Sequence, residues 1–335
     1  MRNVLLVGIG PTAPTALASL ADCCRVVGVV RPVDAAQRAT DPVVSLAARH
    51  GVPVFGITSV KGLRVLVDQL QPDCVVVSSF DRILPADLIA SCPFVNVHYA
   101  PLPQFRGRAS VNWAIITGQP ATAISIHVIA PGLDAGNILF QQSVPIDSRD
   151  TVTDLYDRLN ELQRQHLGET VVRFLSGDPG VPQREEDATY GCTRLPSDGE
   201  IDWSRPTVEI DALIRALAAP FPGAFTYLDG RRLVVWRTCA LDSPRTYAGR
   251  VAGRVVNVSR EHGHVDVLTG DGILRLIEVE AEAGRRVPAA SVVRSVRATL
   301  GLGTGDLLSR IDALEREVDR LRHQLVETAG APARV

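Results

Sequence analysis

Short β-rich runs alternate with helical stretches over the first third of the chain, and this alternation restricts the fold more than any other feature of the sequence. The β-rich runs cover residues 3–8, 25–30, 52–55, 73–78 and 94–98. Parallel strands need crossover helices between them, and those helices cover both faces of the sheet. The pattern therefore predicts an α/β fold with a doubly wound, mostly parallel sheet, followed by two more apolar strands at 124–128 and 138–144.

The pattern changes after a long helix that begins near residue 150. A stretch rich in Gly, Pro and charge follows, and the short strands beyond it, separated by Asp-Gly turns, are typical of a small β-barrel. We expect five segments: a first domain at residues 1–175, a linker at 176–205, the barrel at 206–303, a heptad helix at 304–328 and a frayed tail at 329–335.

Composition excludes several classes of protein. Hydrophobic residues make up 46% of the 335 residues, which rules out global disorder and suits two domains. The 35 basic residues are balanced by 37 acidic ones, so the basic footprint of a polyanion-binding protein is missing. The apolar runs are shorter than the roughly 18 residues that span a bilayer, and the N-terminus does not resemble a signal peptide. We expect a cytoplasmic protein with no membrane partner and, since no C-x-x-C pair occurs, no metal.

The last helix carries apolar residues at alternating four- and three-residue intervals, the spacing of a coiled coil. The a positions hold Ile311, Val318 and Leu325, and the d positions hold Leu307, Leu314 and Leu321. Branched residues at a with Leu at d favour a parallel dimer, and the flanking pairs Arg310–Glu315 and Glu317–Arg322 have opposite charges across it. We expect a homodimer through residues 307–325; an amphipathic helix packed on its own barrel is the alternative.

Polar side chains follow two of the apolar strands. Asn96 and His98 share one face of a strand, since side chains alternate, and Asp134 lies in the Pro/Gly loop after another strand. No Ser or Cys nucleophile accompanies them, so direct transfer between two bound substrates fits better than acyl-enzyme chemistry. Asn96 and a protonated His98 would stabilise an oxyanion, and Asp134 would favour the imidazolium and help move the amine proton. His127, on an apolar strand, is expected to be a hydrogen-bonded core histidine.

The stretch from Asn96 to Gly107, together with the Asp134 loop, resembles the folate-dependent formyltransferases. Their motif is N-x-H-x-S-L-L-P-x-x-R-G followed by D-x-G, and this chain reads NVHYAPLPQFRG and then DAG. SVNWAI at 110–115, DGEIDW at 198–203 and PGAFT at 222–226 resemble the branch of methionyl-tRNA formyltransferase and amino-sugar N-formyltransferases. The resemblance covers residues 1–303 and implies a Rossmann-like catalytic domain, an OB-like C-terminal domain and 10-formyltetrahydrofolate as formyl donor.

The resemblance also implies where the two substrates bind. The catalytic roles fall to Asn96, His98 and Asp134. The folate is expected against two segments, Arg82, Ile83, Leu84 and Pro85, and Val128, Ile129, Ala130, Pro131 and Gly132. The acceptor is expected against Tyr99, Ala100, Arg106, Gly107 and Asn112. Ala100 replaces the serine of the motif and Pro101 its first leucine, a departure that bears on the acceptor more than on the reaction.

We expect the acceptor to be an amine-bearing small molecule, such as an amino-sugar nucleotide or an amino acid like hydroxyornithine. The main alternative is methionyl-tRNA, which needs a basic loop after the second strand. Residues 31–41 hold two arginines against two aspartates there, a poor clamp for phosphates. Water as acceptor would instead make the protein a formyl-folate hydrolase.

Two further alternatives carry less weight. Residues 8–13 match the G-x-G-x-x-A dinucleotide fingerprint, but Arg31 and Pro32 stand where its acidic residue belongs. A tight turn is the simpler explanation of these glycines. A non-enzymatic scaffold would leave the combination of Asn96, His98 and Asp134 as a coincidence.

Overall fold

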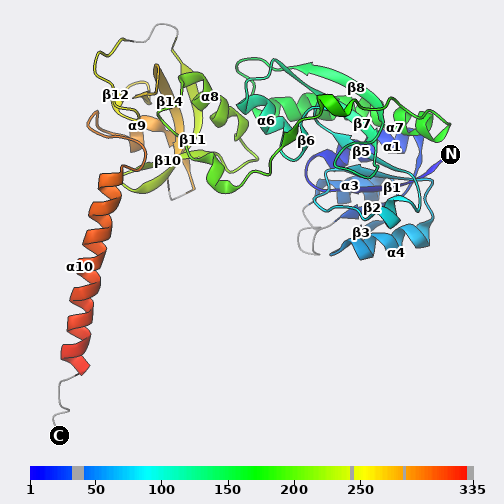
Figure 1. Ribbon diagram of the computed structural model, residues 1–335, viewed down its shortest axis with the longest axis horizontal. Helices are drawn as coiled ribbons and strands as arrows, with labels where there is room; N and C mark the ends of the chain where they lie inside the picture. Colours follow the sequence, from blue (N-terminus) through cyan, green and yellow to red (C-terminus); the bar gives the residue numbers. More distant parts are fainter. Residues whose placement is uncertain (32–40, 242–244, 282–283, 330–335) are drawn as a thin grey trace. The chain divides into compact units, whose positions relative to one another are not determined.

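The computed structural model describes residues 1–31, 41–241, 245–281 and 284–329, which form two compact units (Figure 1). Unit 1 combines Met1–Pro196 with Arg215–Pro220, and unit 2 combines Ser197–Ile214 with the chain from Phe221 onward. Most of the segment predicted as a linker therefore groups with unit 1. Residues 330–335 of the predicted tail lie outside the described residues.

Unit 1 contains a seven-stranded sheet with the strand order β3-β2-β1-β4-β5-β7-β8. The first five strands of this order are parallel: β1 (Asn3–Gly8), β2 (Arg25–Arg31), β3 (Val54–Gly56), β4 (Cys74–Ser78) and β5 (Phe94–His98). β7 (Ala121–Val128) then runs antiparallel to β5, and β8 (Ile138–Pro145) antiparallel to β7.

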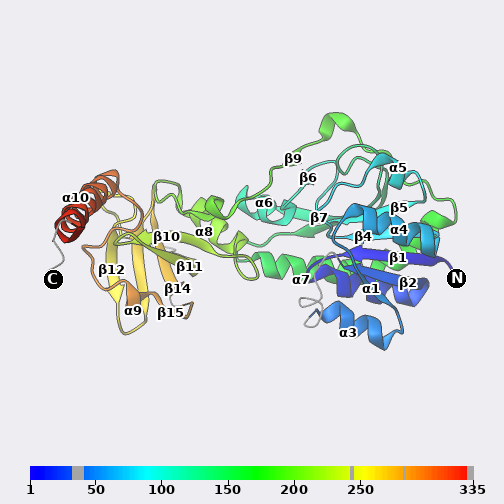
Figure 2. The ribbon, with the colours of Figure 1, turned by 90° about the horizontal axis from the view of Figure 1, so that it is seen from below.

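Helices cover both faces of this sheet (Figure 2). On one face lie α4 (Val60–Leu70) and α5 (Ala86–Ile89), whose Leu63, Val67 and Leu88 belong to the core cluster that also contains Leu5, Val7 and Val75 of the strands. On the other face lie α1 (Thr12–Cys23), α3 (Pro42–Arg49) and α7 (Val152–Leu175), with α1 packed along α7. α6 (Ser110–Ile116) also packs against α7. The predicted doubly wound, mostly parallel fold is confirmed.

The long helix α7 begins where the sequence predicts. The Thr151 hydroxyl accepts the Asp154 N–H and the Asp154 carboxylate accepts the Thr151 N–H, a capping box that satisfies two helix-end donors. Apolar side chains then recur at helical spacing and are buried: Val152, Leu155, Leu159, Leu167 and Val171. This spacing fixes which face of α7 packs on the sheet.

The chain after α7 returns to the loop that follows β5. β6 (Arg106–Gly107) pairs in parallel with β9 (Tyr190–Gly191), and the short helix η1 (Glu185–Asp187) precedes β9. A second short helix, η2 (Pro196–Gly199), comes next. Residues 185–191, within the segment predicted as a linker, therefore pack against the loop that follows β5.

Unit 2 is built on a six-stranded antiparallel sheet. Its order is β10-β11-β14-β13-β12, with β15 paired to β14. The strands are β10 (Ala224–Leu228), β11 (Arg231–Ala240), β12 (Val255–Ser259), β13 (His264–Leu268), β14 (Ile273–Glu280) and β15 (Arg286–Pro288). The helices α8 (Thr207–Ala216) and α9 (Ala289–Val292) flank these strands in the chain. Trp203, buried in this unit, donates its indole N–H to Thr226 Oγ1 at 2.9 Å.

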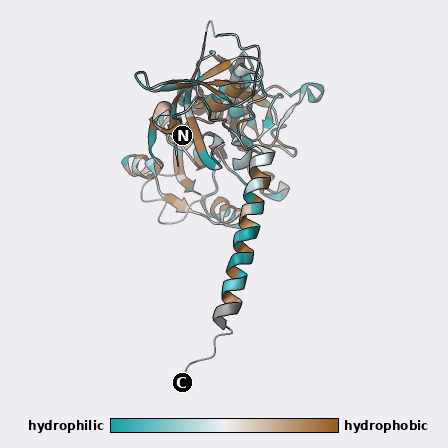
Figure 3. Ribbon diagram, turned by 90° about the vertical axis from the view of Figure 1, so that its left-hand side faces the viewer, coloured by the Kyte–Doolittle hydropathy of each residue, from teal (hydrophilic) through white to brown (hydrophobic). Residues whose placement is uncertain are grey.

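The last helix, α10 (Thr304–Ala329), carries the predicted heptads. Figure 3 shows hydrophobic and hydrophilic residues alternating along it. Its six a and d residues are 42–68% exposed, so nothing in the described chain covers the seam. Among the described residues, none of the helices combines the length and apolar character needed to cross a bilayer.

Candidate active site

The end of β5 carries the first two predicted residues. Asn96 and His98 are two positions apart and extend from the same face of the strand. β5 lies inside the sheet, between β4 and β7. His98 is 7% exposed, and its Nε2 lies 2.8 Å from the Phe105 carbonyl. Because a carbonyl only accepts, Nε2 carries the proton of this hydrogen bond and fixes the ring.

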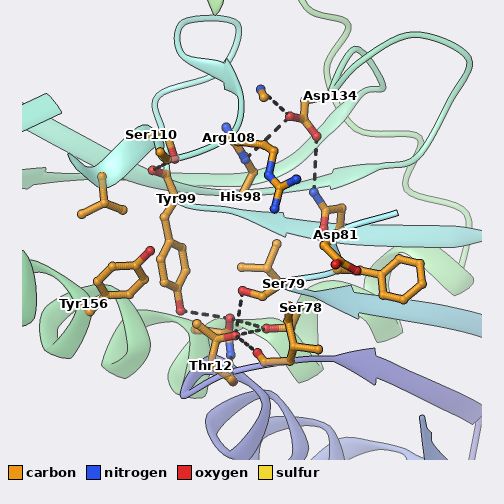
Figure 4. Close-up of a pocket in the computed structure, with 18 of the residues that line it drawn as sticks. Thr12, Ser78, Ser79, Asp81, His98, Tyr99, Arg108, Ser110, Asp134 and Tyr156 are labelled. Carbon is orange, nitrogen blue, oxygen red and sulfur yellow. Dashed lines mark hydrogen bonds and ion pairs between the residues drawn. The ribbon is translucent and has the colours of Figure 1, made fainter. Parts of the chain in front are cut away.

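Asp134, in the loop between β7 and β8, meets both residues (Figure 4). Its Oδ2 accepts the Gly107 N–H at 2.8 Å and lies 3.8 Å from His98 Nδ1. Its Oδ1 lies 3.4 Å from the Asn96 amide nitrogen. Asp134 adopts a left-handed backbone with φ 49°, which turns its side chain back toward β5. The structure thus brings the three predicted residues together.

His127 joins this cluster, because the antiparallel register places it directly opposite Asn96. Its Nδ1 donates to the Val128 carbonyl at 2.9 Å, so in the neutral ring Nε2 accepts from the Asn96 amide at 3.1 Å. Nε2 also lies 3.6 Å from Asp134 Oδ1. His127 is 1% exposed, and its hydrogen bond with the Asn96 amide orients that amide.

Burial and charge set the protonation of the pair His98 and Asp134. Burial lowers the pKa of His98 below its ordinary value of 6.5, and the Asp134 charge and the Phe105 carbonyl offset this only in part. Burial alone would raise the pKa of Asp134, but contacts with His127, His98 and the Gly107 N–H lower it to about 2. At neutral pH the site therefore holds a neutral imidazole beside a carboxylate.

A pocket of about 280 Å³ opens beside these residues at the carboxyl ends of β1, β4 and β5, where ligands bind in open parallel sheets. Asn96, His98 and Asp134 line one side, with Asp81 and Arg108 nearby. Figure 4 shows Thr12, Ser78, Ser79, Tyr99 and Tyr156 on the other side, and Gln163 and the apolar Ile9 and Val111 also line the pocket.

Side-chain hydrogen bonds tie the polar side of the pocket together. The Tyr99 hydroxyl lies 2.8 Å from Asn160 Oδ1 and 3.0 Å from Gln163 Oε1. Ser78 and Ser79 each lie 3.0 Å from the Thr12 hydroxyl. Most of these residues carry no local sequence signal, because α1, β4 and α7 supply them from distant parts of the chain.

Two of the five residues expected to contact the acceptor, Tyr99 and Gly107, line the pocket. The other three, Ala100, Arg106 and Asn112, do not line it and are each 1% exposed. Arg106 is held under the loop by Glu185, at 2.9 Å from both carboxylate oxygens. Asn112 donates to the Ala216 carbonyl at 2.6 Å, and the Ala100 carbonyl accepts from Ser125. Burial of their polar groups in these bonds makes the three residues part of the fold around the pocket.

Each of the two segments expected to bind folate has one residue that packs against the same core cluster. Leu84, from the first segment, and Ile129, from the second, both pack against the cluster that contains Leu88 and Phe94. Arg82 donates to the Thr58 carbonyl, and Ile83 is 90% exposed. Gly132 has a φ of 104°, which the turn before Asp134 requires. Neither segment lines the 280 Å³ pocket.

Arg31 bears on two of the alternatives that the sequence left open. Arg31 is buried and bound to Asp41 and to the Gly8 carbonyl, at the position where a dinucleotide site needs an acidic side chain. Residues 32–40, from the 31–41 loop that was expected to be a poor clamp for tRNA phosphates, lie outside the described residues. Within the described chain, no three His, Cys, Asp or Glu side chains are arranged to hold a metal ion.

Two family models match the chain: formyl transferase over residues 37–171, and formyl transferase, C-terminal domain, over residues 195–297. The methionyl-tRNA formyltransferase of Citrifermentans bemidjiense is 33% identical over 302 residues, which are 86% of this chain and 90% of that protein.

Solved structures share the fold. The N-formyltransferase from Helicobacter canadensis, in complex with folinic acid and dTDP-3-aminofucose, matches with a TM-score of 0.62 and 18% identity, over 82% of this chain and 98% of that chain. HypX from Aquifex aeolicus, in complex with tetrahydrofolic acid, matches with a TM-score of 0.60 and 17% identity. That match covers 88% of this chain but 47% of HypX, so the chain spans about half the length of HypX. Given its two family models and its 33% identical relative, the chain belongs to the formyltransferase family.

Proposed function

We propose that this enzyme transfers a formyl group from 10-formyltetrahydrofolate to the amine of a small, polar acceptor. Family membership supports the reaction and the formyl-folate donor. When bound, the donor supplies the formyl carbonyl that the amine attacks. The exposed Ile83 and the shared core contact of Leu84 and Ile129 give apolar surface on which we propose its pterin packs.

His98 Nδ1 is the atom that we propose takes a proton from the attacking amine. Nε2 is committed to the Phe105 carbonyl, so the lone pair of the neutral ring lies on Nδ1. A proton gained there lies 3.8 Å from the Asp134 carboxylate, which stabilises the resulting imidazolium. That proton would return to the folate nitrogen as its bond to the formyl carbon breaks. This differs from the expectation of a ring already protonated in the resting enzyme, because burial lowers the pKa of His98.

Asn96 is proposed to stabilise the negative charge that develops on the formyl oxygen. One of its amide N–H groups is directed at His127 Nε2. The other reaches Asp134 only at 3.4 Å, a long hydrogen bond that a formyl oxygen can replace.

The pocket beside these residues, which mixes polar side chains with apolar ones such as Ile9 and Val111, is the observation that carries the acceptor proposal. Hydroxyl and amide groups line its far side, and they suit an acceptor that carries hydroxyl or carbonyl groups. These groups already bond to one another, and a polar acceptor would join that hydrogen-bond network. An amino-sugar nucleotide or a polar amino acid such as hydroxyornithine matches this lining.

Methionyl-tRNA is the second candidate acceptor, supported by the 33% identity to a methionyl-tRNA formyltransferase. The contacts of Arg31 argue against it. Arg31 is one of the two arginines of the 31–41 loop, and its guanidinium is buried against Asp41, where it cannot contact a phosphate.

The test is a formyl-transfer screen with 10-formyltetrahydrofolate, read by mass spectrometry for the gain of one formyl group. The panel holds amino-sugar nucleotides, polar amino acids including hydroxyornithine, charged initiator tRNA and a sample without amine. We expect the highest kcat/KM with a small polar amine. Efficient formylation of the tRNA at physiological salt would overturn the acceptor proposal, and rapid formate release without amine would indicate a hydrolase.

The pH profile of kcat/KM is expected to show an acid limb below pH 6.5. A base must be neutral to accept a proton, and burial lowers the pKa of His98 from 6.5, so activity is retained above that lowered pKa and lost as pH falls through it. Because the Asp134 charge raises the pKa of His98, replacing Asp134 moves the limb further toward acid. An acid limb above pH 6.5 that belongs to His98 would contradict this assignment.

We also propose that α10 forms a parallel two-stranded coiled coil with a second copy of the chain. Its seam residues are 42–68% exposed, and burying them is favourable. The facing pairs Arg310–Glu315 and Glu317–Arg322 have opposite charges, which favours a parallel pair. The sheet of unit 2 is proposed to be OB-like and the enzyme to be cytoplasmic.

Replacing Leu314 with Glu is expected to convert the dimer to a monomer, because it places like charges at the centre of the seam. Sedimentation or light scattering measures the change. Arg316→Glu, on the same helix outside the a, d, e and g positions, is the control and leaves the dimer intact. A wild-type chain that is monomeric at all concentrations tested would refute the coiled coil.

A further inference from the structure

We infer that Gln183, from the segment after α7, is a positioning residue that holds Asp134 against His98. The inference rests on the proposed role of Asp134 in formyl transfer. Gln183 lies 49 residues from Asp134 in the chain, and neither motif of the sequence includes it.

The amide nitrogen of Gln183 closes the loop that carries Asp134. It donates to the Asp134 carbonyl at 2.7 Å and to the Gly136 carbonyl at 2.7 Å. The loop has little room to rearrange, since a Cβ on Gly136 would overlap the Val128 carbonyl. The left-handed backbone of Asp134 is therefore clamped from outside by two hydrogen bonds from one side chain.

The amide oxygen of Gln183 makes the opposite kind of contact. It accepts from Arg106 Nη2 at 3.0 Å and from Nε at 3.2 Å. A guanidinium only donates and a carbonyl only accepts, so the Gln183 amide has one possible orientation. Arg106 is itself fixed, because it is 1% exposed and bound to Glu185.

The neighbours of Arg106 in the chain are the backbone partners of the catalytic side chains. Gly107, next to Arg106, donates the N–H that binds Asp134 Oδ2. Phe105, whose carbonyl accepts from His98, donates its own N–H to Thr189 Oγ1 at 2.9 Å. Residues 183–191 thus brace the loop after β5 and the loop after β7 together, and Gln183 is the side chain that touches both.

This bracing fixes the distance between the Asp134 carboxylate and His98 Nδ1, which is 3.8 Å. Misplacing a catalytic group by about 1 Å costs up to roughly 100-fold in rate. We therefore expect Gln183→Ala to lower kcat by about 10- to 100-fold while the KM values for donor and acceptor change little. The acid limb of the pH profile should move to lower pH, since Asp134 raises the pKa of His98.

The experiment compares Gln183→Ala and Gln183→Glu with the control Gln165→Ala, an exposed glutamine on α7 that donates to Glu161 on the same helix. Gln183→Glu keeps the contact with Arg106, and with it that side of the fold, but loses both N–H donors. Both variants are expected to share the loss of kcat, and Gln165→Ala to match wild type. A purely structural role would lower the melting temperature and leave kcat and the pH limb of the folded enzyme unchanged, which would overturn the inference.

A second readout separates this inference from the proposed function. The titration of His98, followed by NMR on histidine-labelled protein, needs no substrate. A lower His98 pKa in Gln183→Ala supports positioning even if every amine of the screen fails. An unchanged His98 titration in folded Gln183→Ala refutes it even if the enzyme is an active formyltransferase.

Discussion

Asp134→Asn is expected to lower kcat by about 1,000-fold. The Asp134 carboxylate lies 3.8 Å from His98 Nδ1. At an effective dielectric constant of about 20, a charge pair at this distance interacts by about 4 kcal/mol, which corresponds to a factor of about 10³ in rate. This interaction exists only when His98 is an imidazolium. Removing it therefore slows the chemical step, and the KM for the folate should change little.

The substitution should leave the loop intact. Asn tolerates the left-handed backbone that Asp134 adopts at φ 49°. The side-chain oxygen of Asn can still accept the Gly107 N–H, which Asp134 accepts at 2.8 Å. Asp22→Asn, an exposed carboxylate paired with Arg164 at 3.3 Å, is the matched control and should keep wild-type activity. A folded Asp134→Asn enzyme with near-normal kcat would remove Asp134 from the mechanism.

The sequence predicts well what depends on local periodicity. The alternation of strands and helices predicts the sheet, and β5 begins and ends where its apolar pattern does. Two-residue alternation puts Asn96 and His98 on one face, and the Pro/Gly loop after the next apolar strand supplies Asp134. The approach of Asp134 to His98 does not follow from this periodicity, because β7 runs antiparallel to β5 and the loop after β7 has to fold back to bring Asp134 to His98.

The sequence does not predict contacts that depend on distant segments. His127 meets Asn96 only because β7 runs antiparallel to β5 in one particular register. The sequence does not separate acceptor binding by Arg106 from a structural tie of its loop, because its partners Gln183 and Glu185 lie 77 and 79 residues away. Asn112 is likewise tied to a carbonyl 104 residues away. No periodic pattern encodes such pairs, so their roles are visible only in the fold.

His98→Gln is the second substitution with a large expected effect, a loss of about 10²–10⁴ in kcat/KM, the range for a general base. The Gln amide can donate to the Phe105 carbonyl as His98 Nε2 does at 2.8 Å, so the loop should keep its place. What disappears is the nitrogen that gains a proton. The residual activity should therefore lose the acid limb that His98 gives the wild-type enzyme.

A double variant with Asp134→Asn tests whether the two residues act as a unit. If Asp134 acts by stabilising the imidazolium of His98, then replacing Asp134 in an enzyme that already lacks His98 should lower the rate little further. The double variant is expected to be about as slow as the slower single variant, since residues that act together are strongly non-additive. Fully multiplicative losses would mean that Asp134 acts on the substrates directly, and that the 3.8 Å contact with His98 is not the source of its effect.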